Sequence, residues 1–119
     1  MMHRKPENLQ SWFENLFSQL GTIDQVVEVL GDSMNPTFKH GSLIAVSNLS
    51  DPSIINWAEC YYVVDKNNQG NVRRVYASHI QNSIQLLADN PDQQKFPPIH
   101  RSWSHIQAIY KVRAEIIKH

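Results

Sequence analysis

The chain contains a single cysteine, Cys60, among its 119 residues and carries no excess of charge of either sign. One cysteine excludes an internal disulfide framework and a cysteine-rich zinc site, and it suits a reducing cytoplasm. Eleven basic residues balance eleven acidic ones, so no overall field attracts a polyanion. The adjacent pair Arg73-Arg74 is too short to follow a phosphate backbone, and direct binding of nucleic acid by this chain is not expected.

Long apolar runs are also absent. No run approaches the ~20 residues that span a bilayer, and polar residues such as Glu14 and Asn15 interrupt the N-terminal apolar region, unlike a signal peptide. We therefore expect a soluble, intracellular protein that does not contact a membrane. Its length fits one domain, which would bury roughly two thirds of the unfolded chain's surface around a single core.

The N-terminal part has apolar residues at helical spacing. Asn8 can cap a helix that Gly21 ends, and the residues between them place one apolar face on it. This face consists of Leu9, Trp12, Phe13, Leu16, Phe17 and Leu20. It needs a partner, either the domain's own sheet, another subunit or a missing N-terminal domain. We divide the chain into residues 1–25, a tail with this amphipathic helix and a turn, and residues 26–119, the domain proper.

The domain proper has the pattern of an antiparallel β-protein. β-branched and aromatic runs bounded by turn residues predict strands at 26–30, 42–47, 60–64, 72–77, 83–88 and 106–117. Asn and Gly residues between 65 and 71 predict a hairpin turn, and Pro97-Pro98 predicts an irregular stretch. The simplest packing is a mainly β barrel or sandwich with one N-terminal amphipathic helix.

A polar turn between the first two strands presents a serine. The segment Gly31–Phe38 reads GDSMNPTF, so the strand must stop, present Ser33 and restart near Gly41. A serine displayed between strands is a candidate nucleophile. Most serines in such positions only shape the turn, and both interpretations stay open at this point.

Three segments together resemble a known family. They are Gly31–Phe38, the hairpin end Val72-Arg73-Arg74-Val75, and Ile84–Pro91 with its sequence IQLLADNP. In this order and spacing they resemble the LexA-type self-cleaving domains of the peptidase S24-like family. That family includes the C-terminal domains of lambda-type phage repressors and the UmuD-like mutagenesis proteins. The resemblance covers about Val26 to Val112 and implies an antiparallel LexA-like fold of the β-clip type. It also places the role of nucleophile on Ser33.

The resemblance fails at the general base. The family uses a lysine where this chain has Arg73. A buried lysine can lose its proton and then accept that of the serine, whereas a guanidinium group, with a pKa above ~12, stays protonated. The family also cuts itself at an Ala-Gly or Cys-Gly bond upstream of the serine, but here Gly21 and Gly31 each follow a leucine. We therefore expect no active catalytic residue and interpret Ser33 as a vestigial nucleophile.

The histidines could in principle replace the missing base. The pair Lys39-His40 lies close to Ser33 in the sequence and His79 follows the hairpin, so a rescued serine–histidine or serine–lysine pair stays an alternative. His100 and His105 are five residues apart, unlike the spacing of a helical zinc pair. No metal and no cofactor are expected.

The resemblance implies a binding function in the cytoplasm of a bacterial host. The leading hypothesis is the oligomerisation domain, forming dimers and higher-order assemblies, of a phage-type repressor that has lost self-cleavage. Such a domain supports cooperative binding to operator DNA through an attached helix-turn-helix domain, and an antirepressor could act as inducer. The alternatives are an active self-cleaving serine peptidase, a signal-peptidase relative, and a UmuD-like accessory subunit.

Two surfaces are candidate oligomer interfaces. The first is the N-terminal face, with Trp12, Phe13, Leu16, Phe17 and Leu20; the second is the long C-terminal strand, with Ile106, Tyr110, Val112 and Ile116. If this strand lies at a sheet edge, it could pair with its copy in a symmetric dimer. If it is paired on both sides within the subunit, it belongs to the core. The sequence leaves both options open.

Overall fold

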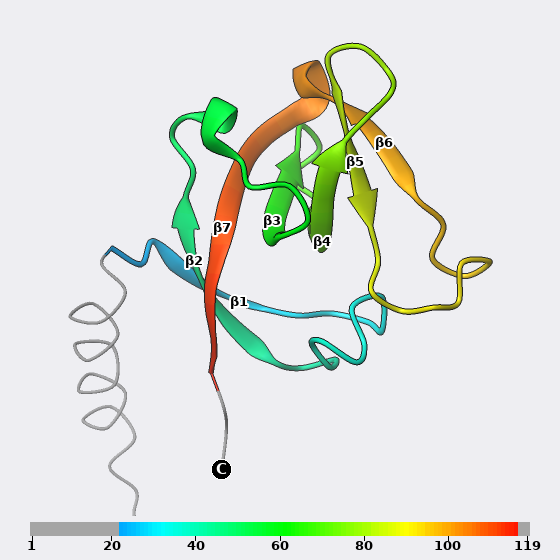
Figure 1. Cartoon of the computed structure of the whole chain (residues 1–119). Helices are drawn as coiled ribbons and strands as arrows, with labels where there is room; N and C mark the ends of the chain where they lie inside the picture. The colour runs from blue at the N-terminus through cyan, green and yellow to red at the C-terminus, as the bar shows by residue number, and fades with distance from the viewer. Residues whose placement is uncertain (1–21, 117–119) are drawn as a thin grey trace, which may run out of the picture.

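The structure is a computed structural model that describes residues 22–116. The predicted N-terminal helix, with its candidate interface residues, lies outside the described residues. The described part contains, in chain order, β1 (Gln25–Glu28), β2 (Leu43–Asn48), η1 (Pro52–Ile54), β3 (Cys60–Asp65), β4 (Gly70–Ala77), β5 (Ser83–Leu87), β6 (Ile99–Ser102), η2 (Trp103–His105) and β7 (Ile106–Ile116) (Figure 1). Between residues 22 and 116 there is no helix with the length and apolar character needed to cross a membrane.

The strands form one open antiparallel sheet in the order β1-β2-β7-β3-β4-β5-β6. The prediction of a mainly β, antiparallel fold is confirmed. β6 was not predicted, because its polar residues His100 and Arg101 directly follow the two prolines and give little strand signal. It forms the edge of the sheet by pairing with β5, from Leu86↔Ile99 to Ser83↔Ser102.

β7 lies inside the sheet although it is the last described strand in the sequence. Residues Tyr110–Ile116 pair with β2, and residues Ile106–Lys111 pair with β3. The two ladders overlap only around Tyr110 and Lys111. Within the described residues, β7 beyond Lys111 therefore has a strand partner on the β2 side alone. Figure 1 shows this half of β7 running away from β3 toward the C-terminus.

The sheet carries a hydrophobic core on each face. Successive residues of a strand point to opposite faces: Tyr61 belongs to the first cluster, and its neighbour Tyr62 packs against the second. The first cluster contains Ile55, Tyr61, Val63, Val75, Ile84, Leu86 and Ile109. The second contains Val29, Met34, Phe38, Ile44, Val46 and Val72. Burial from both sides explains why β3 reads as an unbroken apolar run, CYYVV, instead of alternating.

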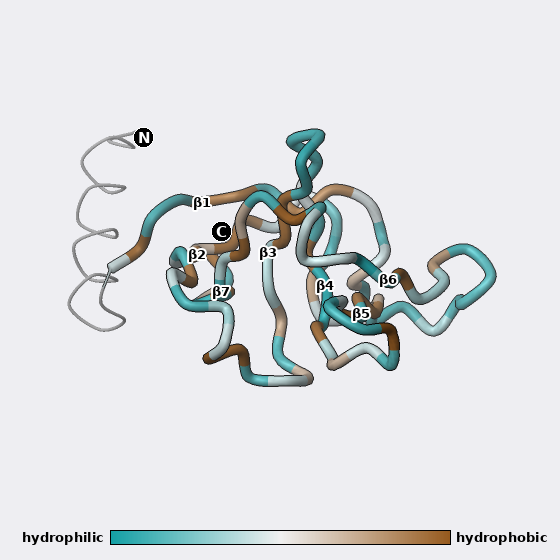
Figure 2. The backbone as a smooth tube through the Cα atoms, turned by 90° about the horizontal axis from the view of Figure 1, so that it is seen from above, coloured by the Kyte–Doolittle hydropathy of each residue, from teal (hydrophilic) through white to brown (hydrophobic). Residues whose placement is uncertain are grey.

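Polar residues gather in the connections between strands. Figure 2 shows hydrophilic residues concentrated in the projecting loops and hydrophobic residues along β1 and β2. The predicted turn between β3 and β4 is closed by Asp65, whose carboxylate accepts the amide hydrogens of Asn67 and Gln69 at 2.8 and 3.0 Å. Next to this turn the ring of Tyr62 covers Gly70, where a Cβ atom would lie 2.2 Å from the tyrosine hydroxyl.

Candidate functional site

The three segments that carry the family resemblance meet in space. The backbone N–H of Asn90, after β5, donates to the carbonyl of Ser33 at 3.0 Å, and its side-chain amide donates to the carbonyl of Asp32 at 2.9 Å. From β4, Arg73 Nη1 donates to Ser33 Oγ at 2.8 Å. Residues far apart in the sequence thus form one site around Ser33.

Apolar side chains fix the serine turn on the sheet. Met34 is fully buried, at 0% exposure, and packs with Phe38 in the second core cluster. The left-handed conformation of Gly31, with φ of 82°, directs the chain from β1 into the turn. The backbone N–H of Gly31 donates to His40 Nδ1 at 2.8 Å, so this histidine closes the turn instead of contacting Ser33.

Ser33 Oγ accepts a hydrogen bond from a cation. Ser33 is buried, at 7% exposure, and its only side-chain partner within the described residues is Arg73. Nη1 of Arg73 also donates to the carbonyl of Val72 at 2.8 Å. Burial lowers the pKa of Arg73 from its ordinary value, but a guanidinium keeps its proton at neutral pH. Arg73 is therefore a donor to Ser33 and not an acceptor of its proton.

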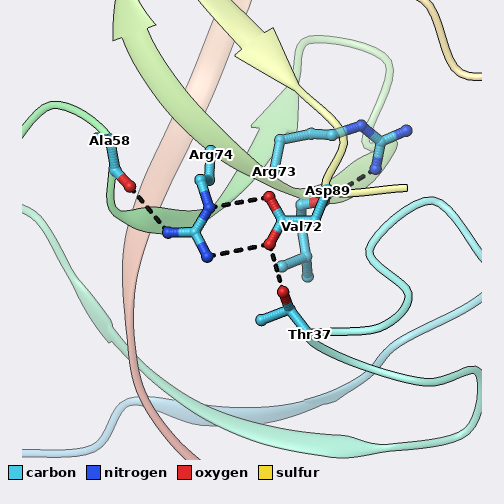
Figure 3. A network of polar contacts seen from close by, with 6 residues as sticks. All are labelled: Thr37, Ala58, Val72, Arg73, Arg74 and Asp89. Atoms are coloured by element: carbon cyan, nitrogen blue, oxygen red, sulfur yellow. Dashed lines mark hydrogen bonds and ion pairs between the residues drawn. The ribbon is translucent and has the colours of Figure 1, made fainter. Parts of the chain in front are cut away.

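The adjacent arginine is bound into a polar network (Figure 3). Arg74 Nε and Nη2 donate to the two carboxylate oxygens of Asp89 at 2.8 and 2.9 Å, and Nη1 donates to the carbonyl of Ala58 at 2.8 Å. The hydroxyl of Thr37 donates to the same carboxylate. The hydrogen bond with Asp89 raises the pKa of Arg74. This network ties β4, the serine turn and the segment after β5 together.

No role was predicted for Thr37 or Asp89, although both belong to the segments that carry the resemblance. The signal available in the sequence was an acidic residue two positions after the end of β5, 15 residues after Arg74. Reading it required the register of β4 and β5, in which Arg74 lies opposite Leu87, two residues before Asp89.

A cleft lies beside Ser33 and Arg73. It has a volume of about 390 Å³ and is lined by residues 27–30 at the end of β1, by Ser33 and Met34, and by Tyr62 with residues 70–73 of β4. Its walls are about equally polar and apolar, and Glu28 contributes an acidic side chain. A larger hollow of about 790 Å³, lined by Trp57 and Trp103 among others, contains none of the three motif segments.

The family model described as Peptidase S24-like matches residues 9–110. The chain belongs to the peptidase S24-like family. The match extends the resemblance toward the N-terminus and includes most of the segment in which the sequence predicts a helix. No curated protein matches the chain.

The candidate interface residues of β7 in this S24-like domain do not form one exposed patch. Ile106 packs against the first core cluster, whereas Tyr110 and Val112 pack against the second. Ile116 is half-buried and lies opposite Leu43 of β2. These side chains therefore contribute to packing within the subunit. What β7 could offer to a second chain is its backbone, on the side beyond Lys111 that has no neighbouring strand among the described residues.

The remaining candidate residues of the S24-like domain are engaged elsewhere. His100 Nδ1 lies 2.8 Å from Ser78 Oγ, and the His100 ring packs edge-on against that of His79, with centroids 5.1 Å apart. Between residues 22 and 116, no group of three metal-binding side chains comes together. Cys60 is half-buried, and burial raises the pKa of its thiol.

Proposed function

We propose that this S24-like domain is the oligomerisation domain of a phage-type transcriptional repressor and that its self-cleavage has been lost. It would form dimers and higher-order assemblies and would support cooperative binding of operator DNA by an attached helix-turn-helix domain. Since self-cleavage could not relieve repression, induction would come from another protein, such as an antirepressor. The location would be the cytoplasm of a bacterial host.

The contact between Arg73 and Ser33 carries the proposal. Attack by a serine requires a base that removes the hydroxyl proton, and such a base must offer a lone pair. In this chain the group within hydrogen-bonding distance of Ser33 Oγ is a guanidinium donor. A domain that keeps the family fold but lacks the catalytic base is expected to serve in binding.

The sheet offers three edges for assembly. Within the described residues, the outer sides of β1 and β6 have no neighbouring strand, and neither does the side of β7 beyond Lys111 that faces away from β2. Unpaired strand edges form backbone hydrogen bonds readily with a second chain, and a symmetric dimer satisfies both copies at once. The edge of β7 is the one that agrees with the interface expected from the sequence.

Incubation at alkaline pH tests the loss of cleavage. In an active relative, alkaline pH deprotonates the catalytic lysine and promotes self-digestion. This chain and any longer parent protein should stay intact, as judged by mass spectrometry, because Arg73 keeps its proton. A specific cut that disappears in Ser33→Ala would show instead that the alternative, an active S24-type peptidase, is correct.

Sedimentation of the purified chain tests assembly. We expect a dimer or larger species at micromolar concentrations, and a strictly monomeric chain at high micromolar concentration would contradict the proposal. The reading frame upstream then separates a repressor from a UmuD-like accessory protein, because only the repressor requires a helix-turn-helix domain.

A further inference from the structure

The larger hollow, of about 790 Å³, has mostly apolar walls. One wall is the connection from β2 to β3, which contains η1, and the other is the chain that runs from η2 into β7. Figure 1 shows η1 and η2 at the same end of the molecule. None of the described residues that line the hollow is charged. An occupant would therefore be held by apolar contact and not by ion pairing.

The floor of this hollow belongs to the core, whereas one side of it is exposed. Leu49, Trp103 and Ile106 pack against the first core cluster. The backbone N–H of Leu49 donates to the carbonyl of Ile109 at 2.9 Å, which joins the two walls. Trp57, which also lines the hollow, is 50% exposed. A half-exposed tryptophan beside an uncharged hollow is apolar surface suited to a partner.

The described chain begins beside this hollow. Ser47 Oγ donates to the carbonyl of Thr22, and the backbone N–H of Asp24 donates to the carbonyl of Val46 at 2.9 Å. The carboxylate of Asp24 in turn accepts the backbone N–H of Asn48, which is itself a lining residue. These bonds fix the point from which the preceding residues extend, and they fix it next to the hollow.

The segment immediately before this point is the one in which the sequence predicts an apolar helix face. A helix over residues 9–20 would be about 18 Å long, at ~1.5 Å per residue. The family model begins at residue 9, so the S24-like match includes this segment. Attachment at Thr22 gives the segment a high local concentration at the hollow, which favours it over a separate partner.

We propose that the hollow is the docking site of the chain's own residues 9–20, whose apolar face packs against Trp57 and Trp103. The N-terminal face would then be covered within the subunit and would not be available as an oligomer interface. The proposal does not depend on the chain being part of a repressor. Assembly through the edge of β7 is tested separately by sedimentation, so either proposal can fail without the other.

The indole N–H signals in ¹⁵N NMR spectra of the full chain test the docking. The chain has three tryptophans, and single Trp→Phe variants assign their signals. Leu16→Ser combined with Phe17→Ser makes the predicted face polar, so we expect the signals of both Trp57 and Trp103 to shift as the hollow is uncovered. The dispersion of the amide spectrum reports whether the variant is folded. Unchanged indole signals of Trp57 and Trp103 in the folded variant would overturn the proposal.

A matched variant controls for any change in the segment. Glu14→Ser combined with Asn15→Ser alters the opposite side of the predicted helix. We expect it to leave the indole signals of Trp57 and Trp103 in place. Shifts as large as those of the variant at positions 16 and 17 would show that the apolar face is not what occupies the hollow.

Nuclear Overhauser effects identify the occupant directly. We expect cross-peaks between the ring of Trp12 and the side chains of Trp57 and Ile106, and their absence would contradict the docking. An equimolar mixture of isotope-labelled and unlabelled chains then separates the chain's own segment from that of a second copy. Cross-peaks confined to single chains support the proposal, whereas cross-peaks between labelled and unlabelled chains would show that a second copy fills the hollow.

Discussion

Arg73 and Arg74 are neighbours on β4, yet they have opposite surroundings. Arg74 donates to both oxygens of the Asp89 carboxylate and to the backbone carbonyl of Ala58, so each of its three nitrogens forms a hydrogen bond. Arg73 donates to the hydroxyl of Ser33 and to the carbonyl of its neighbour Val72, and it is one of the residues that line the cleft. Two identical side chains therefore have different surroundings, and residues from other segments of the chain determine this difference.

The largest effect is expected from Arg74→Ala. It leaves the Asp89 carboxylate, whose side chain is 14% exposed, without its cation and, among residues 22–116, with only the Thr37 hydroxyl as partner. We expect a loss of about 2–3 kcal/mol in the free energy of unfolding, measured by denaturant titration. Arg73→Ala should cost about 1 kcal/mol or less, because its partners are neutral. If Arg73→Ala were the more destabilising change, the assignment of roles would be reversed.

A smaller effect is expected from Gly70→Ala, on the Arg73 side of the comparison. The new methyl group would overlap the Tyr62 ring, which must swing away from β4 and alter the cleft wall. A cost of about 1 kcal/mol in the free energy of unfolding is expected, measured by denaturant titration. Tyr62→Leu in the Gly70→Ala background should recover part of the stability. An unchanged melting temperature in Gly70→Ala would show that the ring does not cover the glycine.

The smallest effect concerns Cys60, which lies opposite Arg74 in the ladder between β3 and β4. Burial raises the pKa of its thiol, and the charge of Arg74 opposes this change. The neutral thiol is therefore favoured, and at about pH 8.5 iodoacetamide should alkylate Cys60 more slowly than free cysteine. Arg74→Ala should raise the pKa further and slow alkylation, whereas Arg73→Ala should leave the rate unchanged. Faster alkylation in a folded Arg74→Ala would contradict the electrostatic role of Arg74.

The sequence predicted those features that depend on local pattern. Strand positions followed from apolar runs such as that of β3, and the turn at Asp65 followed from its Asn and Gly residues. β6 was not predicted, because its pairing with β5, and not its composition, makes it a strand. The site could likewise be predicted only where it depends on local pattern. Ser33 and Arg73 could be named from motifs. The pairing of Asp89 with Arg74, which distinguishes Arg74 from Arg73, depends on the register of β4 and β5.

The position of β7 has a consequence for how the chain acquires its structure during synthesis. Among the described strands, β1 and β2 pair with the β3–β6 meander only through β7. The ribosome releases this connecting strand after all the others, so the two parts of the ladder cannot join until residues 106–116 emerge. Long-range closure of this kind slows folding, because loop-closure entropy is lost before the contacts form. A nascent chain that stalls before β7 would therefore expose the inner edges of both β2 and β3 to aggregation.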